Sequence, residues 1–97
     1  MEEMLYFNEL YDIYSCLLTD KQCKYFEDYY FNNLSFSEMA ENYDVSRNAI
    51  FKQIHIVTDK LEEYERKLNL LEKRKKMEEI MSLIDDEKIK KRIEELI

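Results

Sequence analysis

The sequence predicts an all-α protein of five or six helices that contains a helix-turn-helix and a long C-terminal helical extension. Its 97 residues include no glycine and no proline, the two residues that most often interrupt helices and build hairpin turns. Apolar residues recur at intervals of three and four, as on one face of an α-helix. Short segments rich in Ser, Thr, Asn and Asp separate these stretches and supply the residue types that begin and end helices. A chain of this length forms a single domain, so we expect one domain over residues 1–97.

Two helices are predicted in the N-terminal third. The first covers about residues 2–18, and its buried face consists of residues at helical spacing: Leu10, Ile13, Tyr14 and Leu17. Thr19 and Gln22 match a capping box, in which each side chain satisfies a backbone N–H group of the opening turn. A second helix therefore covers residues 20–31. The asparagines at 32 and 33 end it, since Asn tolerates the left-handed conformation.

The remaining helices follow from the same signals. Ser35 and Glu38 match a second capping box and predict a short helix over residues 36–43. Ser46 caps a fourth helix, which meets no helix-breaking residue before the region of Met77. Apolar residues line it in a seven-residue repeat typical of a coiled-coil seam or of a long helix packed on a partner: Ile50, Ile54, Val57, Leu61, Tyr64, Leu68 and Leu71. Acidic residues 85–87 begin a final helix, within the C-terminal extension over residues 65–97.

Charge is distributed unevenly along the chain. The net charge is −7, but residues 1–46 carry −8 and residues 47–97 carry +1. An acidic protein binds DNA weakly without sequence preference, because neutralisation of phosphates supplies most of that affinity. The basic segment 73–76 is either a contact to phosphate, RNA or an acidic partner or, as its glutamate neighbours favour, a solvated stretch of helix.

Several classes of protein are disfavoured. No N-terminal segment joins a basic start to an apolar stretch, and no run approaches the roughly 18 apolar residues that a membrane span needs. The spacing of Cys16 and Cys23 fits no zinc or redox motif, and His55 has no second soft ligand nearby. No nucleophile stands beside a base, and no glycine-rich loop is present to hold phosphates. We therefore expect a cytoplasmic, non-enzymatic protein with no cofactor, small-molecule ligand or membrane contact.

Residues 35–64 carry the strongest functional pattern, which is typical of a helix-turn-helix. Such a unit needs a small residue in its first helix so that the second can cross closely, and Ala40 supplies it. We expect Val45 to fill the gap between the helices from the turn, and Ile50 to anchor the second helix. Asp44 stands where the turn usually has glycine, so we expect a left-handed conformation there with some strain.

The second helix of such a unit lies in the major groove with its first residues on base edges. Arginine pairs with guanine, whereas asparagine and glutamine pair with adenine. A serine cap and the helix N-terminus can together hold a phosphate. The residues that face outward here, and that we predict to bind DNA, are Ser46, Arg47, Asn48, Lys52 and Gln53. The same pattern also fits a solvated helix face.

The motif and its flanks resemble a known family. The resembling segments are LLTDKQ at residues 17–22, YY at 29–30, LS at 34–35, EMA at 38–40, VSRNAI at 45–50, LEEYE at 61–65 and KL at 67–68. In order and spacing they resemble the YlxM-type family of small bacterial proteins, which are similar to the promoter −35-reading domain of sigma factors. The resemblance covers about residues 5–75. It implies a sigma-like helix-turn-helix fold in which residues 19–30 form the preceding helix.

The resemblance also implies a cellular role. Members of the YlxM-type family are encoded beside the GTPase of the signal recognition particle, which implies involvement in that protein-targeting pathway. One departure concerns the recognition helix. Relatives often place Lys or Arg just after its first turns, whereas this chain has His-Ile-Val at residues 55–57. The departure lowers the positive charge available to phosphates.

Two hypotheses follow. The leading one is a DNA-binding regulatory protein linked to the signal recognition particle pathway. In the alternative, the helix-turn-helix is a scaffold, and the protein binds a protein or ribonucleoprotein component of the signal recognition particle without binding DNA. The acidic, aromatic N-terminal half favours the alternative. The apolar helix faces exceed what one small domain buries, so we also expect a homodimer.

Overall fold

The computed structural model describes residues 2–96, which are all-α and contain no strand. The elements in chain order are α1 (Glu2–Tyr14), the 3-10 helix η1 (Ser15–Leu17), α2 (Asp20–Tyr30), α3 (Phe36–Tyr43), α4 (Arg47–Leu68), α5 (Leu70–Met81) and α6 (Glu87–Glu94). The predicted fold class is therefore confirmed.

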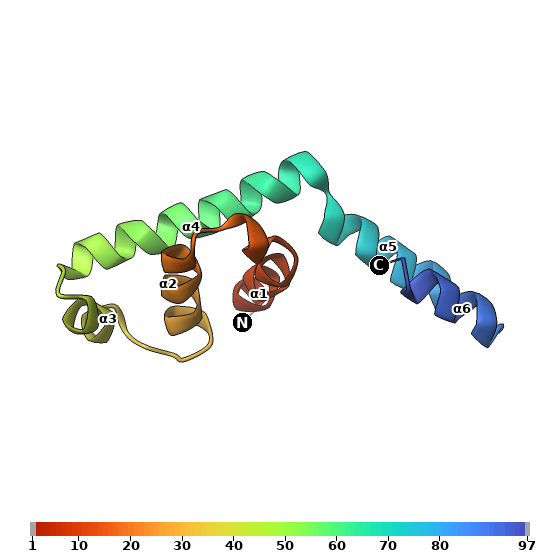
Figure 1. Cartoon of the computed structure of the whole chain (residues 1–97), viewed down its shortest axis with the longest axis horizontal. Coiled ribbons are helices and arrows are strands. Elements are labelled where there is room, and N and C mark those ends of the chain that lie inside the picture. Colours follow the sequence, from red (N-terminus) through yellow and green to blue (C-terminus); the bar gives the residue numbers. More distant parts are fainter. Residues whose placement is uncertain (1, 97) are drawn as a thin grey trace.

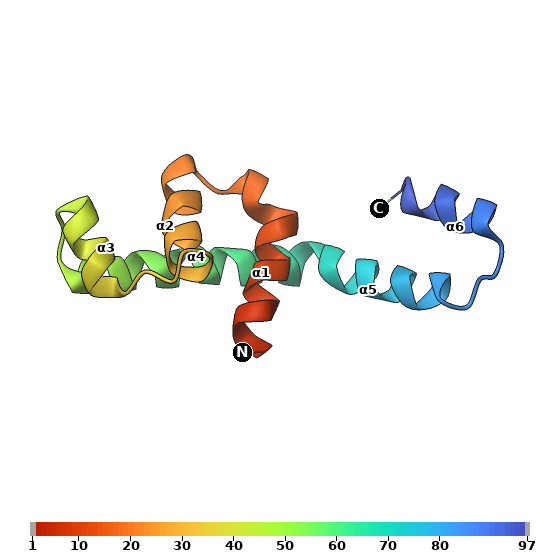
Figure 2. The same ribbon diagram turned by 90° about the horizontal axis from the view of Figure 1, so that it is seen from below.

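Helix α4 is the axis of the molecule. Figure 1 shows α1 and α2 crossing beneath it, with α3 under its first turns. Helix α5 leaves the far end of α4 at an angle, and α6 turns back alongside α5 (Figure 2). The described chain is elongated, with extents of 54 × 25 × 22 Å. We call α5, α6 and their connection the C-terminal hairpin (residues 70–96).

Two capping boxes begin α2 and α3, as the sequence predicts. The Thr19 hydroxyl accepts the N–H of Gln22 at 3.1 Å, and the Gln22 side chain accepts the N–H of Thr19 at 3.0 Å. Ser35 and Glu38 make the same reciprocal pair, with both distances 3.1 Å. Each box satisfies N–H groups that the opening turn leaves without an intrahelical partner. These local interactions fix where α2 and α3 begin.

The first helix is shorter than expected. A single helix over residues 2–18 is wrong, because α1 ends at Tyr14 and the 3-10 helix η1 follows. The tighter 3-10 turn rotates its side chains relative to an α-helical continuation. Leu17, expected on the buried face, is therefore exposed, and Leu18 is buried in its place.

Helix α4 carries two joined hydrophobic clusters. The first lies between α1, α2, α4 and the start of α5, and its buried members are Phe7, Leu10, Tyr14, Leu18, Phe26, Val57, Leu61 and Leu71. The second lies between α2, α3 and α4, and its buried members are Tyr25, Met39, Ile50 and Ile54. Tyr30 packs against both clusters and connects them. The apolar repeat of α4 thus faces its own domain over most of its length.

The expectation that the fourth helix continues to the region of Met77 is wrong. Helix α4 ends at Leu68, and Asn69 adopts the left-handed conformation with φ of 54°. Leu68, which the repeat places in the buried seam, is exposed as a result. Asparagine takes this conformation more readily than most residues, so the chain turns here without a glycine.

Tyr14 and Glu65 hold the α4–α5 junction together. The Tyr14 hydroxyl donates to the Glu65 carboxylate at 2.6 Å and accepts the N–H of Leu70 at 3.1 Å. The same carboxylate accepts the N–H groups of Leu71 at 3.1 Å and Glu72 at 3.2 Å. These are first-turn N–H groups of α5, which an isolated helix leaves unpaired. Side chains of α1 and α4 therefore cap α5.

The basic segment 73–76 is largely exposed, as expected for a solvated stretch of helix, but two of its residues pair with α1. Arg74 forms an ion pair with Asp12 at 3.2 Å, and Lys75 forms one with Glu9 at 3.3 Å. Lys76 is paired within α5. Arg74 and Lys75 therefore neutralise two acidic residues of α1.

We predict that Glu65→Ala destabilises the protein by about 2 kcal/mol, because it leaves a buried tyrosine hydroxyl and helix N–H groups without an acceptor. Urea denaturation followed by circular dichroism measures the change. Glu63→Ala is the matched control, since Glu63 is exposed and pairs only with Lys67 at the surface. Equal midpoints for the two variants would contradict the role assigned to Glu65.

The left-handed turn after α3 gives a second prediction. Asp44 has φ of 53° and ψ of 49°, a region where glycine has no Cβ strain. Because glycine also gains freedom in the unfolded chain, we expect Asp44→Gly to raise the melting temperature by only about 3 °C. Asp44→Ala removes the same charge but keeps a Cβ, so it should melt below the wild type. A glycine variant that melts no higher than the alanine variant would exclude strain at Asp44.

Candidate nucleic-acid interface

The α3–turn–α4 unit has the predicted helix-turn-helix arrangement. Met39 from α3 and Ile50 from α4 are fully buried in the same hydrophobic cluster. Ala40 packs against the same cluster and, as a small residue, lets the two helices approach. The turn leaves α3 through the left-handed Asp44, as expected.

The role expected for Val45 is wrong. Its side chain is 42% exposed and does not fill the space between the helices. Because Asp44 is left-handed, the N–H of Val45 donates a hydrogen bond to the carbonyl of Ala40 at 3.1 Å, and the Val45 side chain faces solvent. Met39 and Tyr25, both buried, fill the space instead.

The N-terminus of α4 is free to meet a ligand. The Ser46 hydroxyl accepts the N–H of Ala49 at 3.0 Å and keeps its own hydrogen for donation. No acidic residue occupies the first turn of α4, so the positive end of its dipole is not neutralised within that turn. This end of the helix therefore favours an anion.

The predicted DNA-binding residues divide between two sides of α4. Arg47, Asn48 and Lys52 are exposed, whereas Gln53 is half-buried. Arg47 and Asn48 border an open hollow of about 520 Å³ together with Phe36 and Phe51. Successive residues of a helix point about 100° apart. The structure therefore gathers Arg47 and Asn48 on one flank and places Gln53 on the other.

Gln53 lies beside the start of α2, a neighbour that the motif alone does not reveal. A hollow of about 180 Å³ is lined by Gln53 and by the opening turns of α2: Thr19, Lys21, Gln22 and Tyr25. The recognition helix and the N-terminus of α2 thus form one surface.

Two lysines of α2 add positive charge, Lys21 at this surface and Lys24 against α3, and the sequence reasoning missed both. The ammonium of Lys21 lies 5.8 Å from the ring centre of Tyr25, and that of Lys24 lies 5.8 Å from the ring centre of Tyr43. They are the two basic residues among residues 1–46, and both fall in the helix before the motif. That concentration is the sequence signal that identifies them.

A tyrosine–aspartate pair fixes α2 against α3. The Tyr43 hydroxyl donates to the Asp28 carboxylate. Burial, followed by this hydrogen bond and the negative charge of Asp28, raises the pKa of Tyr43 well above its ordinary value. Tyr43 therefore stays protonated near neutral pH, and its hydrogen bond to Asp28 holds α3 against α2.

Other kinds of site find less support in the described residues. None of their helices combines the length and the apolar character that crossing a membrane requires. Within the same part of the chain, no three His, Cys, Asp or Glu side chains gather as a metal site.

Comparison with known proteins agrees with this geometry. The model of a family described as "Putative helix-turn-helix protein, YlxM / p13 like" matches residues 1–97. A UPF0122 protein of Ureaplasma urealyticum serovar 10 is 45% identical over 91 residues, which cover 94% of this chain and 92% of the relative. A UPF0122 protein of Halalkalibacterium halodurans is 43% identical over 86 residues, which cover 89% of this chain and 79% of the relative. One of Staphylococcus haemolyticus is 50% identical over 66 residues, which cover 68% of this chain and 60% of the relative. The chain therefore belongs to the UPF0122 family of YlxM/p13-like helix-turn-helix proteins.

Proposed function

We propose that this protein is a non-enzymatic, DNA-binding regulatory protein whose helix α4 enters the major groove. The observation that carries the proposal is the exposed start of α4, whose first two turns present Arg47, Asn48 and Lys52 without an acidic residue among them. Membership of a helix-turn-helix family supports it. In this mode the side chains of Arg47 and Asn48 contact base edges, because Arg matches guanine and Asn matches adenine.

The start of α2 would hold the DNA backbone. Lys21 lines the hollow beside Gln53, and Lys24 lies over the ring of Tyr43 in α3. Lysine ammonium groups contact phosphates. Phosphate contacts of this kind set the register of the protein on the duplex but do not read its sequence. Ser46 and the free N-terminus of α4 provide a further place for a phosphate.

We place this activity in the cytoplasm, linked to the signal recognition particle pathway. The resemblance to YlxM-type proteins, encoded beside the GTPase of that particle, supports the link. The alternative is a scaffold that binds a protein or ribonucleoprotein component of the particle without binding DNA. The charge of −8 over residues 1–46 favours this alternative, because it opposes an approach of those helices to phosphates.

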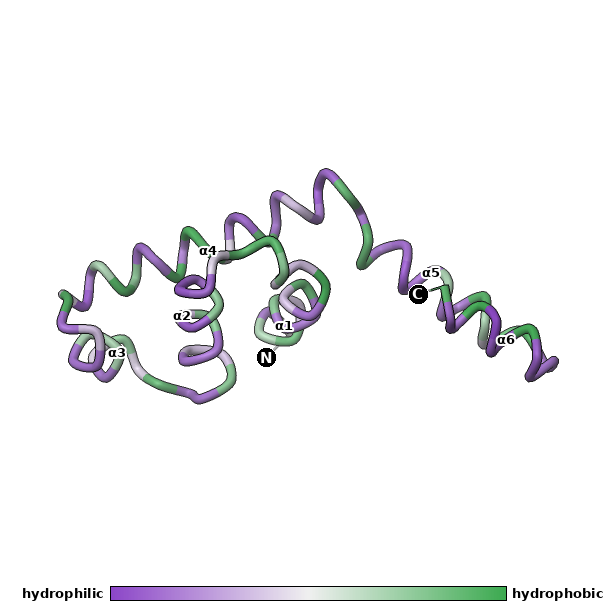
Figure 3. Tube along the Cα trace, viewed as in Figure 1, coloured by the Kyte–Doolittle hydropathy of each residue, from purple (hydrophilic) through white to green (hydrophobic). Residues whose placement is uncertain are grey.

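We also propose a homodimer formed through the C-terminal hairpin. Leu83 is 83% exposed and Leu96 is 80% exposed, and Ile80 and Ile89 are exposed as well. Figure 3 shows hydrophobic stretches along both helices of this hairpin, away from the main body. Apolar side chains gathered on a projecting element are typical of an association surface.

Sequence-specific binding is the first test of the DNA proposal. Purified protein is titrated with pooled genomic fragments at low and physiological salt, and the retained fragments are sequenced. We expect one enriched motif whose affinity falls as salt rises. Arg47→Ala should lower affinity for that motif about tenfold, since a good base contact contributes about 1–3 kcal/mol. Lys21→Ala should weaken binding to all sequences and reduce the salt slope by about one.

Lys91→Ala, an exposed lysine of α6, is the control and should bind like the wild type. Lack of enrichment at both salt concentrations, or an unchanged affinity of the Arg47 variant, would overturn the assignment. Direct binding to the particle's GTPase or RNA would then support the alternative.

The dimer is tested by sedimentation velocity over a range of concentrations. We expect the wild type to sediment as a dimer and Leu83→Glu as a monomer, because a charge in an apolar interface is costly to bury. Leu5→Glu changes an exposed leucine of α1 and should leave the dimer intact. A wild type that is monomeric at all concentrations, or a dimeric Leu83 variant, would refute this surface.

A further inference from the structure

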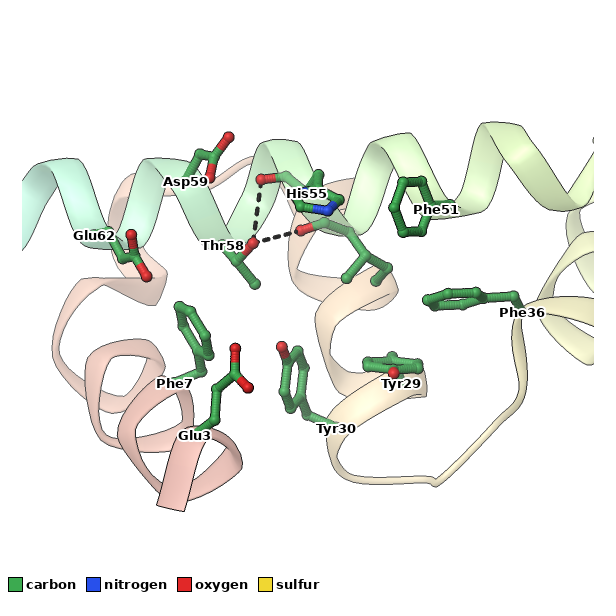
Figure 4. A pocket seen from close by; sticks show the side chains of 11 residues that line it. Glu3, Phe7, Tyr29, Tyr30, Phe36, Phe51, His55, Thr58, Asp59 and Glu62 are labelled. Carbon is green, nitrogen blue, oxygen red and sulfur yellow. Dashed lines mark hydrogen bonds between the residues drawn. The ribbon is translucent and has the colours of Figure 1, made fainter. Parts of the chain in front are cut away.

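A cavity of about 270 Å³ lies between α1, α2, α4 and the start of α3, and none of the predicted DNA-binding residues lines it (Figure 4). Five of its lining residues are aromatic: Phe7, Tyr29, Tyr30, Phe36 and Phe51. Three others are acidic: Glu3, Asp59 and Glu62. The described residues that line it include no lysine and no arginine. The cavity therefore combines aromatic walls with negative charge.

The aromatic walls form a continuous series. Tyr29 stacks on Phe36, with ring centres 4.9 Å apart and an angle of 23°. The rings of Phe36 and Phe51 pack edge to face with centres 6.0 Å apart, and those of Phe51 and His55 do so at 4.7 Å. Ring faces carry the negative part of the aromatic quadrupole, which attracts cations. These walls are therefore suited to a flat cationic group.

The polar groups of the cavity are mainly acceptors. In Figure 4 the carboxylates of Glu3 and Glu62 point into the space beside Phe7, whereas that of Asp59 turns outward at the rim. The Thr58 hydroxyl lies 3.1 Å from the carbonyl of Ile54 and 3.2 Å from the next one, so its hydrogen is engaged and its lone pairs remain.

Among the described residues, the acids that line the cavity take part in no ion pair. The ion pairs among the described residues involve other carboxylates, on α1, α4, α5 and α6. Burial, and after it the proximity of Tyr29, Glu3 and Glu62, raises the pKa of Tyr30 to about 12. The negative charge around Tyr30 is thus available to a ligand.

We propose that this cavity binds an arginine side chain from a basic segment of a protein partner. The guanidinium is planar, stacks on aromatic faces and donates several N–H groups to carboxylates, which matches both features of the cavity. At about 270 Å³ the cavity is smaller than the roughly 300–1,000 Å³ typical of small-molecule sites, so it suits a single side chain. Phosphates are repelled here, and Lys21, which we propose contacts a phosphate, lines a different hollow.

The test uses the full chain and two blocked peptides. One has the sequence Gly-Arg-Gly-Arg-Gly, and in the other citrulline replaces both arginines. Citrulline keeps the shape of arginine but carries no charge. Calorimetry measures affinity, and amide chemical shifts in nuclear magnetic resonance spectra locate the site. We expect binding of the arginine peptide alone, with shifts centred on Phe51, His55, Thr58 and Glu62.

The double variant Glu3→Gln and Glu62→Gln should bind the arginine peptide about tenfold more weakly, the loss expected for two partly exposed ion pairs. Glu63→Gln, whose side chain pairs with Lys67, is the matched control and should bind like the wild type. Thermal unfolding confirms that each variant is folded. Equal binding of the citrulline peptide, no loss in the double variant, or shifts confined to other helices would each overturn the proposal. Because the double variant removes negative charge, its DNA binding is not expected to weaken, so a loss of peptide binding and a loss of DNA binding are distinguishable.

Discussion

The carboxylate of Glu65 joins three helices, and the arrangement of the molecule depends on this junction. It accepts the hydroxyl of Tyr14 from α1 and two N–H groups from the first turn of α5. Because Tyr14 is buried in the first cluster, the same contact closes α1 against α4 and directs the C-terminal hairpin away from the body. Asn69 makes no side-chain cap of its own, so this junction caps α5 from outside. The recognition turn lies at the opposite end of α4, about 33 Å away at 1.5 Å per residue.

Local signals predicted much of the fold, whereas long-range contacts set the rest. The starts of α2 and α3 follow from Thr19 and Ser35, whose partners are three residues away in the sequence. The end of α4 does not follow from nearby residues, because in a chain without glycine or proline Asn69 resembles any polar position on a helix. Its cause is the contact of Tyr14 with Glu65, which are 51 positions apart. No periodicity within α4 contains that information.

The same division explains the candidate interface. The residue types at the start of α4 predicted an exposed polar turn, and the structure has one. Val45 was expected inside because the motif usually buries it, but the backbone bond back to Ala40 turns its side chain outward. The grouping of Gln53 with Lys21 depends on how α2 crosses α4, which is a property of the hydrophobic clusters. Sequence spacing can identify such residues but cannot place them on one surface.

The net charge of the chain conceals two opposed surfaces along α4. One flank lies beside Lys21 of α2, and the other faces the cavity with Glu3 and Glu62. At physiological salt, charges are screened over about 8 Å, so local composition matters more than the total of −7. Phe51 lines both the acidic cavity and the hollow beside Arg47. An occupant that displaces this ring would therefore alter the surface proposed to read DNA, and by linkage DNA would alter the affinity of that occupant by the same factor.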